Sequence, residues 1–313
     1  MIFEYCFPPG PYPGRKTVDK RHKTMKKGKY ITLQLALVIY IFFLLFFVAQ
    51  PLFYNTSISF RDLSGKLTIS NYVKFLTDPI LHTIIFNTFI WTIGSIVFQM
   101  LMGLIVALTL ARPFPGYILA RMILLVLPWA MPDVVAAVSW QWMYNDMYGV
   151  INDILQKLHL VHFSIPWLSK PGLARVAVII ANIWKGYPLS GMFYLAALQG
   201  IPQEVFEAAA VDGSSSLQTF FYISLPSIRK YIITTLMLTT IWTINYFPLI
   251  YTMTGGGPAN ATDTFVTYAY RLAFRFLDFH GAAAVSTINF LIIIIPSLIY
   301  LRILNNMGGE TTI

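Results

Sequence analysis

The chain has 313 residues, of which 57% are hydrophobic and only 11% are charged. An ordinary soluble domain contains roughly 25% charged residues, so this composition excludes a water-soluble fold. The formal net charge is +9, but the basic residues are concentrated near the N-terminus, and a nucleic-acid-binding protein would carry basic stripes on a polar chain. The single cysteine, Cys6, cannot form an internal disulfide, and no Cys/His cluster has the spacing of metal ligands.

Six apolar segments are each long enough to cross a bilayer core, which takes about 20 helical residues. We predict transmembrane helices over Ile31–Tyr54, Thr83–Leu110, Met122–Tyr144, Val176–Leu198, Tyr231–Thr252 and Gly281–Leu301. The third span contains Asp133 and the fourth contains Lys185, whereas the other four carry no charge. The sequence lacks the alternating ten-residue segments of a membrane barrel. We therefore expect an all-α integral membrane protein.

The residues before the first span set the expected orientation. Arg and Lys side chains are abundant in residues 1–29, and the positive-inside rule places such a segment in the cytoplasm. Six spans would return residues 306–313 to the same side. We interpret 1–29 as a disordered tail, with a contact between its basic part and membrane lipid as the alternative. The first apolar segment exceeds the core of a cleaved signal peptide, so we expect a retained span.

Residues 199–230 connect the fourth and fifth spans and read as two short helices around a turn. Gly213 can adopt the left-handed conformation that ends the first helix. Asp212 or Ser214 can cap the second helix, and Pro226 is expected to stop it.

Helices this short are marginal in water and need a surface to dock against. A membrane surface favours Lys and Arg on the polar face of such a helix, and residues 203–222 contain neither. We therefore expect a groove on another protein as the partner of this segment.

Several motifs, taken together, resemble those of a known family. The connecting segment contains Glu207-Ala208-Ala209, Asp212-Gly213, Ile223 and Leu225-Pro226. Elsewhere the chain contains Leu127-Pro128, Met131-Pro132, Tyr148-Gly149-Val150-Ile151-Asn152, Asn182-Ile183-Trp184-Lys185-Gly186, Thr254-Gly255-Gly256-Gly257-Pro258 and Gly281-Ala282-Ala283-Ala284. Over about residues 30–305 this combination resembles the transmembrane permeases of binding-protein-dependent ATP-binding-cassette (ABC) importers, in the carbohydrate class of the maltose-transporter type.

The resemblance implies a type I ABC importer permease fold, a set of partners and a location in a bacterial plasma membrane, the inner one where a cell has two. It implies that the chain pairs with a second, similar permease, binds two ATPase subunits below the membrane, and receives a carbohydrate from an extracytoplasmic solute-binding protein. The sequence has no phosphate-binding loop of the Gly-x-x-x-x-Gly-Lys-Ser/Thr type. We therefore expect a non-catalytic subunit without a cofactor or metal, with ATP and Mg bound by partner chains. The expected ATPase-coupling residues are Glu207, Ala208, Ala209, Asp212 and Gly213.

Polar groups near the middle of a span are candidates for a substrate path. In the fifth span Thr239, Trp242, Thr243 and Tyr246 are spaced i, i+3, i+4 and i+7, so they share one helix face. Hydroxyls and aromatic rings suit a sugar. In the fourth span Lys185, Gly186 and Leu189 lie near mid-depth, and the resemblance places both groups at positions that line the sugar site. Helix packing is the alternative role for each residue.

The lysine in the fourth span leaves the substrate's charge open. Lys185 can mark an anionic substrate, such as a uronate oligomer or a glycerol phosphate, or it can pair with Asp133. Asp133 can instead cap a helix that restarts after Pro132. An ion-coupled secondary transporter is a remote alternative, because such a carrier would not need the segment between the fourth and fifth spans.

Overall fold

The computed structural model describes residues 34–308, which form helices and connecting loops without a β-strand in that range. The predicted tail 1–29 lies outside the described residues, as do residues 309–313 of the predicted C-terminal tail. The chain divides into two compact units, Met1–Ser57 and Ile58–Ile313.

In the first unit the described residues form a helix that runs from Gln34 and includes the π-helical stretch η1 (Leu45–Ala49) and α2 (Gln50–Ser59). This helix corresponds to the first predicted span. Its apolar side chains are exposed, and its phenylalanine rings stack on one another one turn apart, Phe42 on Phe46 and Phe43 on Phe47. Such a surface is stable in lipid and unfavourable in water.

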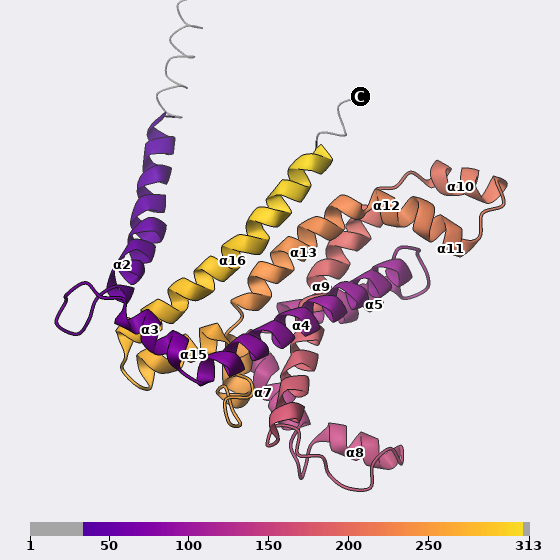
Figure 1. Cartoon of the computed structure of the whole chain (residues 1–313). Coiled ribbons are helices and arrows are strands. Elements are labelled where there is room, and N and C mark those ends of the chain that lie inside the picture. The colour runs from indigo at the N-terminus through magenta and orange to yellow at the C-terminus, as the bar shows by residue number, and fades with distance from the viewer. Residues whose placement is uncertain (1–33, 309–313) are drawn as a thin grey trace, which may run out of the picture. The chain divides into compact units, whose positions relative to one another are not determined.

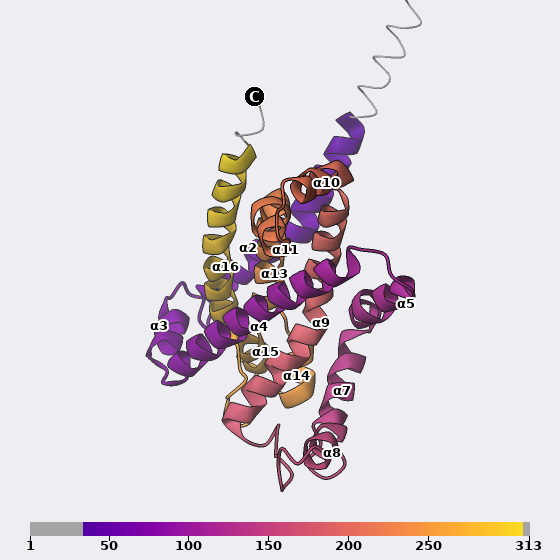
Figure 2. The ribbon, with the colours of Figure 1, turned by 90° about the vertical axis from the view of Figure 1, so that its right-hand side faces the viewer.

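The second unit holds the remaining helices (Figure 1). They are α3 (Ser70–Thr77), α4 (Ile80–Leu110), α5 (Tyr117–Arg121), η2 (Met122–Val126), α6 (Leu127–Ala130), α7 (Asp133–Met143), α8 (Val150–Lys157), α9 (Pro171–Gln199), α10 (Gln203–Val211), α11 (Ser216–Thr219), η3 (Phe220–Ser224), α12 (Leu225–Ser227), α13 (Arg229–Ile244), α14 (Pro248–Thr254), α15 (Phe265–Phe274) and α16 (Phe279–Gly308). Figures 1 and 2 show α10 and α11 at one end of this unit and α8 at the opposite end.

Three of the described helices are long and apolar enough to cross a membrane, and five spans result if each bent pair counts as one. The third and fifth predicted spans are the bent pairs: the chain turns by 104° between α6 and α7 and by 40° between α13 and α14. Each second helix starts at or directly after a proline, Pro132 or Pro248, which disrupts the helical hydrogen bonds before it. The 29-residue helix α9 occupies the position of the fourth predicted span.

Helices α4 and α9 pack against each other in the centre of the unit. Thr88, Thr92, Ser95 and Gln99 recur on one face of α4 and are all buried. The amide nitrogen of Gln99 donates a hydrogen bond of 2.9 Å to the carbonyl oxygen of Asn182 on α9. This stripe directs polar side chains into the interior of an otherwise apolar helix.

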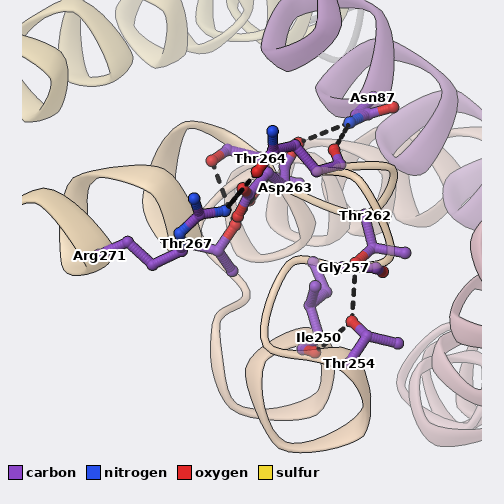
Figure 3. Close-up of polar contacts among 10 residues, drawn as sticks. Asn87, Ile250, Thr254, Gly257, Thr262, Asp263, Thr264, Thr267 and Arg271 are labelled. Carbon is purple, nitrogen blue, oxygen red and sulfur yellow. Dashed lines mark hydrogen bonds and ion pairs between the residues drawn. The ribbon is translucent and has the colours of Figure 1, made fainter. Parts of the chain in front are cut away.

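The loop of residues 255–264, between α14 and α15, is held by a buried polar network (Figure 3). Asp263 is fully buried and forms an ion pair with Arg271, which also donates a hydrogen bond of 2.7 Å to the side-chain oxygen of Asn260. The side chain of Asn87 on α4 donates to the carbonyl oxygens of Asn260 and Asp263, at 2.7 and 3.0 Å. Burial raises the pKa of Asp263 to about 6, against the opposing effect of the Arg271 guanidinium.

Candidate functional site

A cavity of about 360 Å³ lies among α4, α6, α7, α9 and α13. All seven residues predicted for the substrate path line it, namely Lys185, Gly186, Leu189, Thr239, Trp242, Thr243 and Tyr246. Six more residues complete the lining: Gln99, Trp129, Met131, Pro132, Asp133 and Asn182. The two faces that the sequence places on separate spans therefore meet at one site.

Lys185 is bonded to the break between α6 and α7. Its ammonium group donates to the carbonyl oxygens of Pro128, Trp129 and Met131, at 3.1, 2.9 and 2.7 Å. The last carbonyls of a helix have no partner within the helix, and a positive charge is favourable beside them. The lysine thus stabilises the end of α6 where the chain turns.

Asp133 is the first residue of α7, and Pro132 is the N-cap, without a side-chain capping hydrogen bond. The interpretation of Asp133 as a capping side chain is therefore wrong. Its Oδ1 instead lies 3.5 Å from the Lys185 ammonium and accepts a hydrogen bond of 2.7 Å from the hydroxyl of Tyr246. The alternative pairing of Asp133 with Lys185 is present, and the start of α7 further favours the negative charge.

The space beside Gly186 is filled by Gln99. A Cβ atom on Gly186 would lie 2.3 Å from the amide nitrogen of Gln99 and 2.5 Å from its Cδ. Gly186 lines the cavity and also leaves room for the side chain of Gln99, whose amide bonds to α9.

The remaining lining combines aromatic rings with unused polar atoms. The rings of Trp129 and Trp242 meet edge to face, with centroids 5.4 Å apart, and half of Trp242 is exposed. Within the described part of the chain, Nδ2 of Asn182 and Oγ1 of Thr239 are buried without a hydrogen-bond partner. Both residues line the cavity, although these two atoms are themselves enclosed by protein.

The segment between α9 and α13 has the predicted form of two helices around a turn. Gly213 has a φ of +75°, the left-handed conformation that favours glycine. The expectation that Asp212 or Ser214 caps the second helix is wrong, because Ser215 forms a capping box with Gln218. Pro226 does not stop this helix either; it lies within α12 at the end of the continuous run of α11, η3 and α12.

We name residues 203–227 the coupling segment. Of its five predicted contact residues, Glu207, Ala208, Asp212 and Gly213 are exposed, whereas Ala209 is buried. Large apolar side chains are exposed on it as well: Val211 by 88%, Leu217 by 71% and Tyr222 by 80%. A hollow of about 280 Å³ beside the turn is lined by Asp212, Gly213, Ser214, Gln218, Thr219, Tyr222 and Ile223.

Comparisons with known proteins identify the family. Residues 25–306 match the model described as the binding-protein-dependent transport system inner membrane component. The chain belongs to this family. It is a membrane-embedded permease of the inner membrane.

Individual relatives agree with this assignment. The permease is 31% identical over 292 residues to the trehalose/maltose transport system permease protein of Thermococcus litoralis, covering 92% of this chain and 96% of that protein. It is 33% identical over 234 residues to a probable ABC transporter permease protein of Brucella suis, covering 75% and 81%. A crystal structure of a bacterial ABC transporter involved in alginate import has the same fold, with a TM-score of 0.74 at 24% identity, covering 94% of this chain and 100% of that chain.

Sequence reasoning missed part of the permease's cavity. Gln99 and Asn182 lie in the second and fourth spans and were not selected, although amides at mid-span are the kind of group that marks a path. The recurrence of Thr88, Thr92, Ser95 and Gln99 on one face is the signal that identifies the first of them. Trp129 and Met131 carry no comparable signal, because the turn between α6 and α7 directs them to the site.

Among the residues that the structure describes, no group of three or more His, Cys, Asp or Glu side chains is arranged to hold a metal ion.

Proposed function

We propose that this permease forms half of a translocation path for a sugar or oligosaccharide, in an importer driven by ATP hydrolysis on separate subunits. The observation that carries the proposal is the cavity of about 360 Å³ lined by residues of both predicted faces. Tryptophan rings can stack on the apolar faces of a sugar, and the amide and hydroxyl groups can bond its hydroxyls. The name of the trehalose/maltose relative supports the same substrate class.

The coupling segment is the proposed contact with the ATPase subunits. A permease without its own phosphate-binding loop must receive its energy through such a contact, and ATP and Mg would be bound by those partner chains. Exposed Val211 and Leu217 and the turn at Gly213 suit insertion into a groove of another protein. Closure of an ATPase pair would then move α10 and α11 as rigid bodies and change the access to the cavity.

The proposal includes a defined orientation and partners. The C-terminal end of α16 lies at the same end of the second unit as the coupling segment (Figure 1), which supports a cytoplasmic side for both. A second, homologous permease chain would supply the other half of the path, and an extracytoplasmic binding protein would deliver the carbohydrate. The exposed phenylalanine face of residues 34–59 would lie against lipid or partner helices.

Uptake under selective energy depletion tests this function. In cells that express the permease with its partners, we expect carbohydrate uptake to stop when ATP is depleted while the ion gradient persists. Uptake that follows the ion gradient and persists without ATP would instead identify an ion-coupled transporter. The matched control is a strain that lacks this chain and retains the other subunits.

A further inference from the structure

We infer that the cavity selects uncharged saccharides: Oδ2 of Asp133 accepts hydrogen bonds from substrate hydroxyls, and Lys185 is a positioning residue that does not bind the substrate. The inference rests on the proposed function, because it assigns a substrate class to the same cavity. The two charged side chains of the lining, Lys185 and Asp133, differ in how many of their polar atoms are bonded within the chain.

The ammonium group of Lys185 donates its hydrogen bonds to acceptors within the chain. An ammonium group has three N–H donors, and this one meets three backbone carbonyl oxygens within 3.1 Å. Its side chain is 11% exposed. A substrate anion would have to displace carbonyls at the end of α6 to reach it, which would leave those carbonyls without partners.

Asp133, in contrast to Lys185, uses only one of its two carboxylate oxygens in its contacts with the described residues. Both of its contacts, to Lys185 and to Tyr246, use Oδ1. Within the described part of the chain Oδ2 accepts no hydrogen bond, and 36% of the side chain is exposed. The charged atom that remains available to bond a ligand is therefore Oδ2 of Asp133, while the ammonium group of Lys185 is already bonded.

The neutral polar groups of the cavity complement a polyhydroxyl ligand. Asn182 and Thr239 give the lining neutral polar side chains, and neither Nδ2 of Asn182 nor Oγ1 of Thr239 has a hydrogen-bond partner in the described residues. A saccharide hydroxyl can donate a hydrogen bond to Oδ2 of Asp133. A uronate brings a second negative charge toward Asp133, and like charges repel.

Direct binding measurements on the purified complex test this preference. The permease is purified with its co-purifying subunits and without the binding protein, so that the specificity of that protein does not enter. Quenching of tryptophan fluorescence reports binding, because Trp129 and Trp242 line the cavity. The probes are maltotriose and trigalacturonate, which have equal length and differ in carrying no or three carboxylates.

We expect maltotriose to bind at least tenfold more tightly than trigalacturonate. Asp133→Asn should reduce this ratio about tenfold, whereas Asp133→Glu, which keeps the carboxylate, should retain it. Asp153→Asn is the matched control, since it removes an exposed carboxylate on α8 outside the cavity, and should leave the ratio unchanged.

Two results would overturn the inference alone: equal or tighter binding of trigalacturonate, or an unchanged ratio in an Asp133→Asn variant that retains the thermal stability of the unmodified complex. Binding of neither trisaccharide, together with an absence of ATP-dependent carbohydrate uptake, would overturn the proposed function as well.

Discussion

The 255–264 loop and the coupling segment are two connections of the same permease that differ in how much of their side-chain surface the chain itself buries. In the loop Asp263 is completely buried; Arg271 pairs with its carboxylate, and Asn87 donates a hydrogen bond to its backbone carbonyl oxygen. In the coupling segment the side chains of Val211 and Leu217 are exposed by 88% and 71%. The loop is thus stabilised within the chain, whereas the coupling segment presents a surface that only a partner can bury.

Family sequence patterns therefore have two different physical roles in this permease. Both connections carry sequence patterns of the family, but in the loop they serve folding and in the coupling segment we propose that they serve contact with another subunit. Changes in the loop should therefore lower the free energy of unfolding of the isolated chain. Changes in the coupling segment should leave that free energy almost unchanged and impair transport.

The largest expected effect on stability comes from Arg271→Met. The substitution leaves the carboxylate of Asp263 buried without its cationic partner, and breaking a buried pair in this way costs about 3–5 kcal/mol. Thermal unfolding of the purified chain in detergent measures the loss. Arg275→Met, four residues further and exposed, is the control. Equal melting temperatures for the two variants would show that the loop is not held by this pair.

A smaller effect is expected from pH acting on Asp263. Its pKa is about 6 in the fold and 3.8 for an unperturbed carboxyl group, so the folded chain binds the proton more tightly. The stabilising contribution of protonation is complete below pH 3.8 and is lost as the pH rises to about 6, for a change of about 2–3 kcal/mol. Thermal unfolding of the unmodified chain and Asp263→Asn should therefore diverge over this range. A constant difference between them would contradict the shifted pKa.

Gly213→Asp in the coupling segment should have a modest effect on stability and a severe one on transport. A side chain at a φ of +75° is strained by about 1 kcal/mol, while the altered turn would misplace α10 against the ATPase. We expect the chain to reach the membrane, ATP hydrolysis to continue and substrate uptake to be lost. Gly200→Ala, at a φ of −80°, should retain uptake. Normal uptake by Gly213→Asp would remove the docking role from this turn.

The smallest effect on the chain itself should come from Leu217→Ser. The side chain is exposed by 71%, so its replacement should change the melting temperature of the isolated chain by less than a degree. Retention of the ATPase subunits during purification should nevertheless fall, because an apolar anchor at a protein interface would be lost. Leu63→Ser, exposed by 93% in the loop after α2, serves as a comparison. Identical ATPase retention by both variants would exclude Leu217 from the contact.

Much of this molecule could be predicted from sequence, for identifiable physical reasons. Long apolar segments must be helices in a membrane, and the i, i+3, i+4 spacing of Thr239, Trp242 and Thr243 on α13 gathers those side chains at one cavity. Tyr246 also lines the cavity, but from the break between α13 and α14, which the predicted continuous helix did not include. The bonds of Lys185 could not be predicted, because they depend on the 104° turn that brings the end of α6 to α9. The capping role of Ser215 was missed because neighbouring Asp and Ser residues compete equally well in sequence.

The most direct test of the central claim is the composition of the complex in native membranes. The tagged chain is solubilised gently and recovered, and the proteins that remain bound are identified by mass spectrometry. We expect to recover a second permease of the same family together with an ATPase that contains a phosphate-binding loop. Recovery of the chain alone, or only with copies of itself, would contradict a role as one permease subunit of an ATP-driven importer.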